Sequence, residues 1–358
     1  MSEPSAAPAI NEEKMQAFMG KVVTDFGASL SVILSYMGTK LGLYDALAAS
    51  SGMTSAELAA KTGTNERYVR EWLVNQAAGD YVHYDPATAK FSLLPEQKVA
   101  LTDEASPFYV AGGFYAMKAM LNAQPRILDS FKNGGGMLWG EHDPDLFVGT
   151  EKFFRPGYTG FLTASWIPAL TGIEEKLKAG ARVADVGCGH GASTIIMAKT
   201  YPNSKFFGFD THPASIETAT KRAADAGVSD RVSFTVCSAS DLPASGFDLI
   251  TFFDCLHDMG DPHGAAKRAF EALDDGGSCM IVEPMAGENV EDNFNPIGRT
   301  FSGASSLCCT ANSMAQGGPA LGAIASDSAL REVVTSGGFA HFGRATETPF
   351  NRVFEARK

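Results

Sequence analysis

A short glycine-rich turn at residues 185–191 is the clearest candidate for ligand binding in this sequence. It reads Asp-Val-Gly-Cys-Gly-His-Gly and ends an apolar run at 182–186 that predicts a β-strand. Glycines at such a turn let the backbone approach a ligand, and a helix predicted to begin near Ala192 presents free N–H groups. Asp210 ends the next predicted strand, where a carboxylate can accept hydrogen bonds from both hydroxyls of a ribose. Together these features predict a nucleoside-containing cofactor.

The glycine spacing alone also fits a loose dinucleotide-binding pattern, so a nicotinamide cofactor stays open at this point. Three features favour another cofactor. Asp185 stands two residues before the first glycine, where an acid suits a cofactor with a cationic amino-acid end and no pyrophosphate. Polar residues follow the third predicted strand at 237–241. Runs at 341–346 and 350–355 predict a C-terminal β-hairpin.

A second group with chemical potential follows the predicted strand at 247–253, where residues 254–258 read Asp-Cys-Leu-His-Asp. A neutral imidazole near its normal pKa can take a proton from an attacking hydroxyl, which makes His257 a candidate general base. The alternative is a structural histidine that caps the following helix. No pair among the six cysteines has the C-x-x-C spacing, so we expect reduced thiols that pack as small apolar groups, and no metal site.

These motifs, in this order, resemble the class I S-adenosylmethionine-dependent methyltransferases. The shared pattern runs D-V-G-C-G-x-G, G-F-D, x-x-S-D-L-P, F-D-L-I, D-D-G-G and a closing G-F hairpin. With a winged helix at its front end, the chain is similar to small-molecule O-methyltransferases over roughly residues 40–358. The resemblance implies S-adenosylmethionine as cofactor and a small-molecule acceptor.

The resemblance also implies roles for the matching residues. The glycine loop and its leading acid would hold the methionine part, Asp210 the ribose, and the residues after the third strand the adenine. His257 matches the general base, and Glu283 matches the acid that orients it. The implied cofactor-binding set is Asp185, Gly187, Cys188, Gly189, Gly191, Asp210, Thr211, Ser238, Ala239, Asp241, Phe253 and Asp254.

The sequence departs from the family pattern at two positions. The usual acid after the third strand aligns with Ser238, so the nearby Asp241 either contacts the adenine or caps a helix. A second acid that supports the histidine falls at Ile324, with Asp327 out of register. The acid–histidine–acid arrangement is therefore incomplete, and proximity and alignment are a second way to promote methyl transfer from a sulfonium.

Short apolar runs alternate with helical patterns in the second half of the chain. The runs lie at 182–186, 205–210, 232–236, 247–253 and 278–283. They predict an α/β fold with a doubly wound, mostly parallel seven-stranded sheet and a C-terminal antiparallel hairpin. The expected divisions are a disordered tail at 1–10, a winged-helix and dimerisation domain at 11–100, a helical connector and substrate-pocket region at 101–178, and a methyltransferase domain at 179–358 with a lid-like insertion at 286–325.

The N-terminal part predicts a mainly α winged-helix domain. Residues 11–50 read as helical, capped helices follow at 54–61 and 66–78, and runs at 81–84 and 90–93 predict a hairpin. Acidic residues slightly outnumber basic ones between 54 and 98, whereas phosphate contact requires an excess of positive charge. We therefore expect this domain to form a homodimer rather than to bind nucleic acid.

The composition is that of a globular protein with no nucleic-acid or membrane partner. The net charge is −12, from 29 basic and 41 acidic side chains, and no continuous apolar run reaches bilayer length. The start of the chain lacks the pattern of a signal peptide, so we expect a cytoplasmic protein. Aromatic side chains at 114–121, 153–170 and near Phe294 and Phe301 predict a largely apolar acceptor. The expected reaction is methylation of a hydroxyl oxygen; the alternatives are a nicotinamide-dependent oxidoreductase and a winged-helix transcription regulator with a degenerate cofactor fold.

Overall fold

The computed structural model describes residues 10–244 and 246–358, so nearly all of the expected tail at 1–10 lies outside the described residues. The chain divides into two compact units, Met1–Asp103 and Glu104–Lys358. This division falls close to the boundary expected at residue 100.

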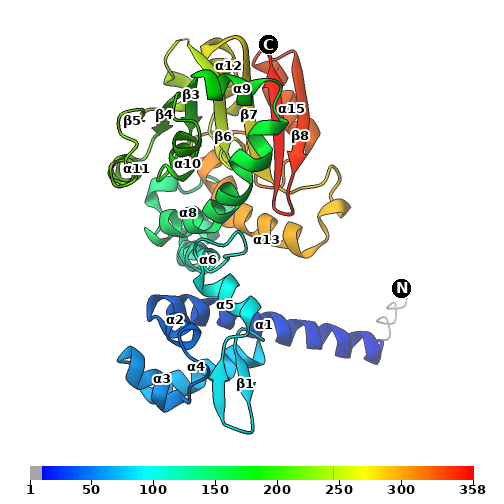
Figure 1. The fold of residues 1–358 in the computed structure, drawn as a ribbon. Helices are drawn as coiled ribbons and strands as arrows, with labels where there is room; N and C mark the ends of the chain where they lie inside the picture. Colours follow the sequence, from blue (N-terminus) through cyan, green and yellow to red (C-terminus); the bar gives the residue numbers. More distant parts are fainter. Residues whose placement is uncertain (1–9, 245) are drawn as a thin grey trace, which may run out of the picture. The chain divides into compact units, whose positions relative to one another are not determined.

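The first unit contains the helices and the hairpin of a winged helix (Figure 1). Its elements are α1 Glu12–Lys40, α2 Leu43–Ala48, α3 Ser55–Thr62, α4 Glu66–Ala78, β1 His83–Asp85, β2 Lys90–Ser92 and α5 Pro95–Thr102. Thr54 begins α3 with a capping box shared with Glu57, and the Asn65 side chain caps α4. The start signals in the sequence therefore lie where these helices begin.

Helix α1 departs from the expectation that no segment has the length and hydropathy to cross a bilayer. Among the described residues it is the one helix that passes such a test, by length and composition only. Only 6% of its most apolar window is buried within the chain. Charged side chains interrupt this segment, which is why a search for a continuous apolar run passes over it.

The second unit begins with helices that precede the sheet. They are α6 Gly112–Asn122, α7 Gln124–Asn133, η1 Trp139–Glu141, α8 Asp145–Gly157, η2 Tyr158–Trp166, η3 Ile167–Ala169 and α9 Ile173–Ala179. Helices α6 and α8 pack closely because glycines stand where they cross: a Cβ at Gly149 would lie 2.3 Å from the backbone nitrogen of Ala116. This close packing holds α6 and α8 of the connector against each other.

The sheet has the seven strands that the sequence predicts, in the order β5-β4-β3-β6-β7-β9-β8. Its elements are β3 Arg182–Val186, α10 Ala192–Thr200, β4 Lys205–Asp210, α11 Pro213–Asp225, β5 Val232–Val236, β6 Phe247–Phe253, α12 Pro262–Ala272, β7 Leu273–Pro284, α15 Asp327–Ser336, β8 His341–Glu347 and β9 Asn351–Arg357. β3 to β7 pair in parallel, whereas β9 pairs antiparallel with both β7 and β8. The chain order reverses between β3 and β6, and ligands bind at such a switch point in open α/β sheets.

Helices cover both faces of this sheet (Figure 1). Successive residues of β7 alternate between two cores: Cys279 and Ile281 pack with α12 and α15, whereas Met280 and Val282 pack with η2, α9 and α10. The alternation follows from the two-residue period of a strand, and burial on both faces explains why the strands read as apolar runs.

The segment at 286–325, expected to be a lid-like insertion, is largely helical. It contains η6 Glu291–Asn293, α13 Pro296–Ala304, the π-helical turn η7 Ser305–Cys309 and α14 Thr310–Ala315. The Asn295 side chain accepts a hydrogen bond from the backbone N–H of Gly298, and Pro296 occupies the first turn. Asn-Pro is thus a helix start here, although this composition suggests a loop.

Candidate active site

A cavity of about 740 Å³ lies in the second unit at the carboxyl ends of β3, β4, β5 and β6. Nine of the twelve predicted cofactor-binding residues line it: Gly187, Cys188, Gly189, Asp210, Thr211, Ser238, Ala239, Phe253 and Asp254. His257 lines the same cavity. Asp185, Gly191 and Asp241 do not, and neither does Glu283. The parallel strands thus bring together most of the predicted residues, because their carboxyl ends share one edge of the sheet.

The glycine loop has a backbone that favours glycine at each of its three positions. Gly187, Gly189 and Gly191 have φ values of 73°, 51° and 77°, in the left-handed region. A Cβ at Gly187 would lie 2.7 Å from the sulfur of Cys255, and one at Gly191 would lie 2.6 Å from the Phe234 ring. At Gly189 a Cβ would meet nothing within 4 Å, so the backbone there borders open space in the cavity. This loop has room for a ligand that approaches the main chain.

Asp185 lies beneath the loop rather than in the cavity. Its Oδ2 accepts hydrogen bonds from Ser193 at 2.7 Å and Thr194 at 2.5 Å, and its Oδ1 accepts one from Thr251 at 3.1 Å. Burial raises the pKa of Asp185 to about 6. Asp185 thus ties β3 to the start of α10 and fixes the loop, and its contact with the methionine part stays a prediction.

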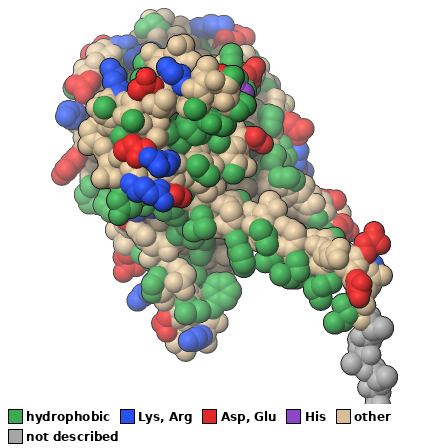
Figure 2. All heavy atoms as spheres, turned by 90° about the horizontal axis from the view of Figure 1, so that it is seen from below, with side chains coloured by type: hydrophobic (Ala, Val, Ile, Leu, Met, Phe, Trp, Pro, Cys, Tyr) green, Lys and Arg blue, Asp and Glu red, His purple; other side chains and the backbone are tan. Residues whose placement is uncertain are grey.

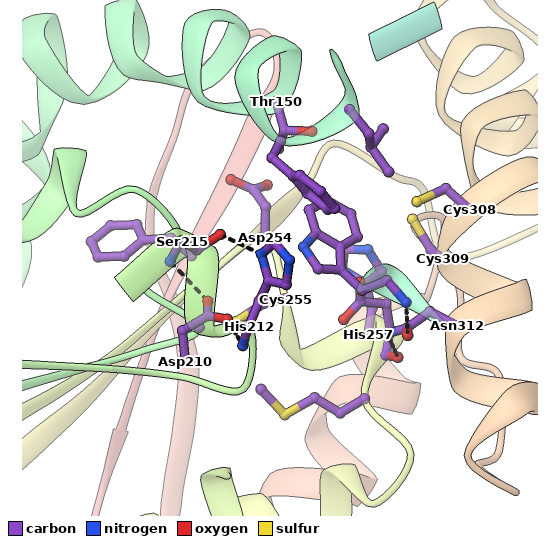
Figure 3. A pocket seen from close by; sticks show the side chains of 18 of the residues that line it. Thr150, Asp210, His212, Ser215, Asp254, Cys255, His257, Cys308, Cys309 and Asn312 are labelled. Carbon is purple, nitrogen blue, oxygen red and sulfur yellow. Dashed lines mark hydrogen bonds between the residues drawn. The ribbon is translucent and has the colours of Figure 1, made fainter. Parts of the chain in front are cut away.

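Asp210 joins the glycine loop to the next turn. Its Oδ2 accepts the backbone N–H of Gly189 at 2.9 Å, and its Oδ1 accepts the N–H of His212 at 2.8 Å (Figure 3). Each carboxylate oxygen still has a second acceptor position, because an oxygen of this kind has two lone pairs. Burial raises the pKa of Asp210. These positions suit a ribose diol, as the sequence predicts.

The turn that follows β5 is organised around Ser238. The Ser238 hydroxyl donates to Asp241 Oδ2 at 2.5 Å, and Asp241 is exposed at the end of the 3-10 turn η4 Ala239–Asp241. Asp241 lies outside the cavity lining, whereas Ser238 and Ala239 border it. Asp241 ends η4 and does not cap the start of a helix, so that alternative is wrong; its contact with adenine stays a prediction.

His257 and Glu283 form a buried pair at one end of the cavity. His257 Nδ1 lies 2.5 Å from Glu283 Oε2, and the two residues are 2% and 0% exposed. Burial is the largest single influence and lowers the pKa of His257, but the charge of Glu283, the Cys309 thiol and the hydrogen bond to Glu283 together outweigh burial, so the pKa lies well above its ordinary value. This differs from the expectation of a histidine near its normal pKa. Glu283 contacts the imidazole at Nδ1 and does not line the cavity, and its role in orienting a base stays a prediction.

The sequence places Ile324 at the position of the second supporting acid and Asp327 out of register. Asp327 instead pairs with Arg344 at 2.8 Å and with the fully buried Arg352 at 2.7 Å. Arg352 also donates to the carbonyl oxygens of Pro284 and Ala325. Asp327 is therefore committed to holding α15 against the C-terminal hairpin.

Asp254 lies in the cavity beside the histidine and has a left-handed backbone, with φ of 51°. Its Oδ2 accepts the Tyr158 hydroxyl at 3.1 Å, and its Oδ1 accepts the Asn351 amide at 2.8 Å. Burial, followed by the charge of Glu283, raises the pKa of Asp254 to about 8. Burial likewise raises the pKa of Asp258 to about 7.

The remaining wall of the cavity comes from the connector and from the segment at 286–325. Of the three aromatic-bearing segments expected to line a pocket, the first contributes Ala116, Met117 and Met120, and the second contributes Phe153, Phe154 and Tyr158. The third contributes Phe301 but not Phe294, whose side chain is 80% exposed. This wall is largely apolar.

Sequence reasoning missed several cavity residues. The His212 ring packs on Phe147 with centroids 4.5 Å apart, and Phe147 packs on Trp139 at 5.5 Å. Their positions depend on how α8 folds over the sheet, which no local pattern reveals. Cys308 and Cys309 also line the cavity, from η7. Among the described residues no group of three or more histidine, cysteine or acidic side chains is placed to hold a metal ion.

Comparison with known families assigns both units. A profile described as a methyltransferase domain matches residues 177–328, and one described as an Rv2258c-like winged helix-turn-helix domain matches residues 28–103. The chain combines a winged helix-turn-helix domain with a methyltransferase domain. This confirms the predicted resemblance and fold, and S-adenosylmethionine is the cofactor of this domain class.

Individual relatives agree with this assignment. The 27-O-demethylrifamycin SV methyltransferase of Amycolatopsis mediterranei is 31% identical over 161 residues, which cover 43% of this chain and 55% of that protein. Human N-acetylserotonin methyltransferase, solved in complex with SAM, has a TM-score of 0.71 at 17% identity, with 99% of both chains covered. An O-methyltransferase family protein from Burkholderia thailandensis has a TM-score of 0.70 at 17% identity, covering 98% of this chain and 99% of that one. At these identities the structural likeness shows the fold alone, and the chain spans about half the length of the curated relatives it matches.

Proposed function

We propose that this chain transfers the methyl group of S-adenosylmethionine to a hydroxyl oxygen of a small, largely apolar acceptor. One observation carries the proposal: the glycine loop, the Asp210 carboxylate and the Glu283-backed His257 border a single cavity at the switch point of the sheet. When bound, the cofactor supplies a methyl group that its sulfonium sulfur makes electrophilic.

The charge of the cavity supports a cationic cofactor over a dinucleotide. Among the described residues that line it, six are acidic and none is lysine or arginine. A pyrophosphate carries negative charge and would face these carboxylates without a cationic side chain. A sulfonium and an ammonium group instead gain from them. Of the acidic residues, Asp210 and Asp254 lie at the ends of β4 and β6, where they would hold the ribose and the cationic end.

His257 is the residue we assign to the acceptor proton. Its Nδ1 is engaged by Glu283, so its second ring nitrogen, Nε2, is the one available on the cavity side. Glu283 fixes the ring orientation and stabilises the imidazolium that forms after proton uptake. The imidazole accepts a proton only in its neutral form, so the rate of transfer rises with pH as pH passes the raised pKa of His257. The apolar wall from α6, α8 and α13 excludes water around the acceptor.

The names of two curated relatives favour oxygen as the methylated atom. They are the 27-O-demethylrifamycin SV methyltransferase and the erythromycin 3''-O-methyltransferase, at 31% and 32% identity over part of their length. A third relative is named as an N-methyltransferase at 26% identity. The methylated atom is therefore identified directly, by incubating the protein with methyl-labelled cofactor and a panel of matched phenols, alcohols and amines.

Calorimetric titration tests the cofactor, and a variant tests the base. We expect S-adenosylmethionine and its demethylated product to bind and NADPH not to bind; binding of NADPH alone would refute the proposal. His257→Ala should lower turnover by about 10²- to 10⁴-fold and leave cofactor affinity near that of the wild type. Unchanged turnover would remove the base and leave proximity as the source of catalysis.

We further propose that the protein is a cytoplasmic homodimer joined through α1, without nucleic acid or membrane partners. Large apolar side chains follow each other at helical spacing on α1 and are exposed: Met15, Phe18, Met19, Val23, Phe26 and Leu30 (Figure 2). Such a stripe needs a partner, and a second copy of the chain supplies a matching one. Sedimentation compares the mass of the wild type with that of a Phe26→Lys, Leu30→Lys variant, and a monomeric wild type would contradict the proposed homodimer. Binding of the wild type to neutral vesicles would instead favour a membrane partner for α1.

A further inference from the structure

A buried arginine on the C-terminal hairpin contacts two segments that carry the His257–Glu283 pair. Arg352 is 0% exposed and lies opposite Glu283 in the register of β9 and β7. Its Nε donates to the carbonyl oxygen of Pro284 at 2.9 Å, directly after Glu283. Its Nη2 donates to the carbonyl oxygen of Ala325 at 2.8 Å, in the segment that leads into α15. One guanidinium group thus bonds the end of β7 and the segment before α15 at the same time.

The segment before α15, residues 322–325, holds the main chain of His257. The backbone N–H of Gly322 donates to the carbonyl oxygen of His257 at 3.2 Å. The backbone N–H of Ala325 donates in turn to the carbonyl oxygen of Gly322 at 3.0 Å. Arg352, which bonds the carbonyl oxygen of Ala325, is therefore linked to the histidine by a short chain of main-chain hydrogen bonds.

A carboxylate anchors the guanidinium group on its third side. Arg352 Nη1 donates to Asp327 Oδ1 at 2.7 Å, and Asp327 stands in the first turn of α15, which packs beside β8 (Figure 1). Arg344, on β8, donates to the same carboxylate at 2.8 and 2.9 Å, and its other terminal nitrogen donates to Glu347. The two arginines share one acid, but Arg352 spends its remaining donors on the carbonyl oxygens next to the pair, whereas Arg344 is bonded to a second acid.

We propose that Arg352 is a positioning residue whose guanidinium group sets how closely His257 and Glu283 approach each other. This rests on the proposed function, in which His257 receives the acceptor proton. Arginine suits the task because its planar fork carries five N–H donors, enough to bond a carboxylate and two carbonyl oxygens at once. Ile324, at the position of the second supporting acid in the family pattern, has no side-chain group that could hydrogen-bond the imidazole. The order that Arg352 imposes on the main chain around it holds the histidine instead.

The ionisable groups that face His257 define the background of any test. Glu283 approaches from β7, and Asp254 and Asp258 lie at the end of β6 and in the turn that follows. The Cys309 thiol acts on His257 from η7. The charge of Glu283 and its hydrogen bond both raise the pKa of His257. A wider gap between the imidazole and Glu283 should therefore move the His257 titration to lower pH.

The first test follows the His257 imidazole by nuclear magnetic resonance in the full-length protein with ¹⁵N-labelled histidine. Its signals are assigned by their loss in His257→Asn. We expect Arg352→Lys to move the His257 titration to lower pH; lysine keeps the positive charge but not the fork, so lost charge cannot explain the shift. Arg344→Lys is the matched control, because it alters the other arginine bound to Asp327 and should leave the titration unchanged. A titration in Arg352→Lys that stays in place or moves to higher pH would overturn the proposal.

A second test guards against an Arg352 variant that does not fold. Asp327→Ala leaves Arg352 in place and removes an anchoring side chain that is 32% exposed. Because loss of a negative charge by itself lowers the pKa of a histidine, the quantity followed here is the proton resonance of His257 Nδ1–H, which moves to higher field when the hydrogen bond to Glu283 lengthens. We expect this resonance to move in Asp327→Ala and to stay in place in Glu347→Ala, which removes the other acid bound to Arg344. An unmoved resonance in Asp327→Ala would contradict the proposal.

Both tests are independent of methyl transfer. If calorimetry shows no S-adenosylmethionine binding, the proposed function fails while the His257 signals still report on Arg352. Once an acceptor is known, Arg352→Lys should lower kcat about tenfold, a fraction of what a general base contributes, and should move the rise of kcat/KM to lower pH. The KM of the cofactor should not change, because Arg352 does not line the cavity. A lower melting temperature with an unchanged kcat and pH profile would show that Arg352 only stabilises the fold.

Discussion

Replacement of Asp210 by asparagine gives a sharp test of how the cavity holds its cofactor. The two carboxylate oxygens accept one backbone N–H each, from Gly189 and His212, and each has one acceptor position left. If both positions serve a ribose diol, the wild type makes two hydrogen bonds to a charged group. Asparagine keeps one oxygen, and its NH₂ group faces one of the two backbone donors.

The expected loss follows from these bonds. A hydrogen bond to a charged partner contributes about 1.5–3 kcal/mol and one to a neutral partner about 1 kcal/mol. Because asparagine keeps one neutral oxygen acceptor, the loss is about 2–5 kcal/mol, or about 30- to 5,000-fold in Kd. The mismatched NH₂ also destabilises the folded chain, by about 1–3 kcal/mol for one unsatisfied buried group. The variant should therefore melt at a lower temperature but remain folded at the temperature of the assay.

Calorimetry with S-adenosylmethionine and with its demethylated product separates two explanations. A ribose contact is common to both ligands, so both should lose affinity by the same factor in Asp210→Asn. If Asp210 acts through charge on the sulfonium, S-adenosylmethionine should lose more. Asp241→Asn is the control, because its carboxylate is exposed and lies outside the cavity lining. An Asp210→Asn variant that binds both ligands within about threefold of wild type would refute the ribose role.

Two further predictions concern the base and the packing beneath the loop. Glu283→Gln removes a charge that raises the pKa of His257. In the wild type, kcat/KM should rise with pH well above the ordinary histidine pKa, and in the variant this rise should move to lower pH. An unmoved pH profile would show that another group sets the pH dependence of kcat/KM. Gly208→Ala would place a Cβ 2.3 Å from the Phe234 ring and 2.9 Å from the sulfur of Cys188, which should lower the free energy of unfolding by about 1–3 kcal/mol in urea titrations. Unchanged stability would mean that the Phe234 ring moves aside freely.

Much of the fold could be predicted from the sequence because its signals are local. The strands at 182–186, 205–210, 232–236 and 247–253 begin and end where the apolar runs do. In the central strands at 182–186 and 247–253 the reason is that both faces are buried. The carboxyl ends of parallel strands share one edge of the sheet, so the sequence predicts that the glycine loop and Asp210 lie close together there. The charge balance of the winged helix is also a property of composition alone.

The segment at 286–325 shows where composition misleads. Gly, Ser and Asn predict an irregular insertion, but the side chain of Asn295 caps α13, and helices from this segment wall the cavity. Asp185 is a second example. Its place before the glycines suggests a ligand contact, yet three hydroxyl groups from α10 and β6 surround its carboxylate. A polar residue's role depends on which partners burial brings to it, and those partners are distant in sequence.

The sequence by itself determined where the strands lie along the chain, and it predicted a nucleoside site at their carboxyl edge and His257 as a candidate base. These follow from periodicities of two and 3.6 residues and from glycines that adopt positive φ, all of which act over a few residues. Only the tertiary structure decided that Asp327 pairs with Arg352 and that Cys309 lines the same cavity as His257. Such contacts join η7, α15 and the C-terminal hairpin to positions far along the chain, and their geometry is fixed by packing of whole elements rather than by any local pattern.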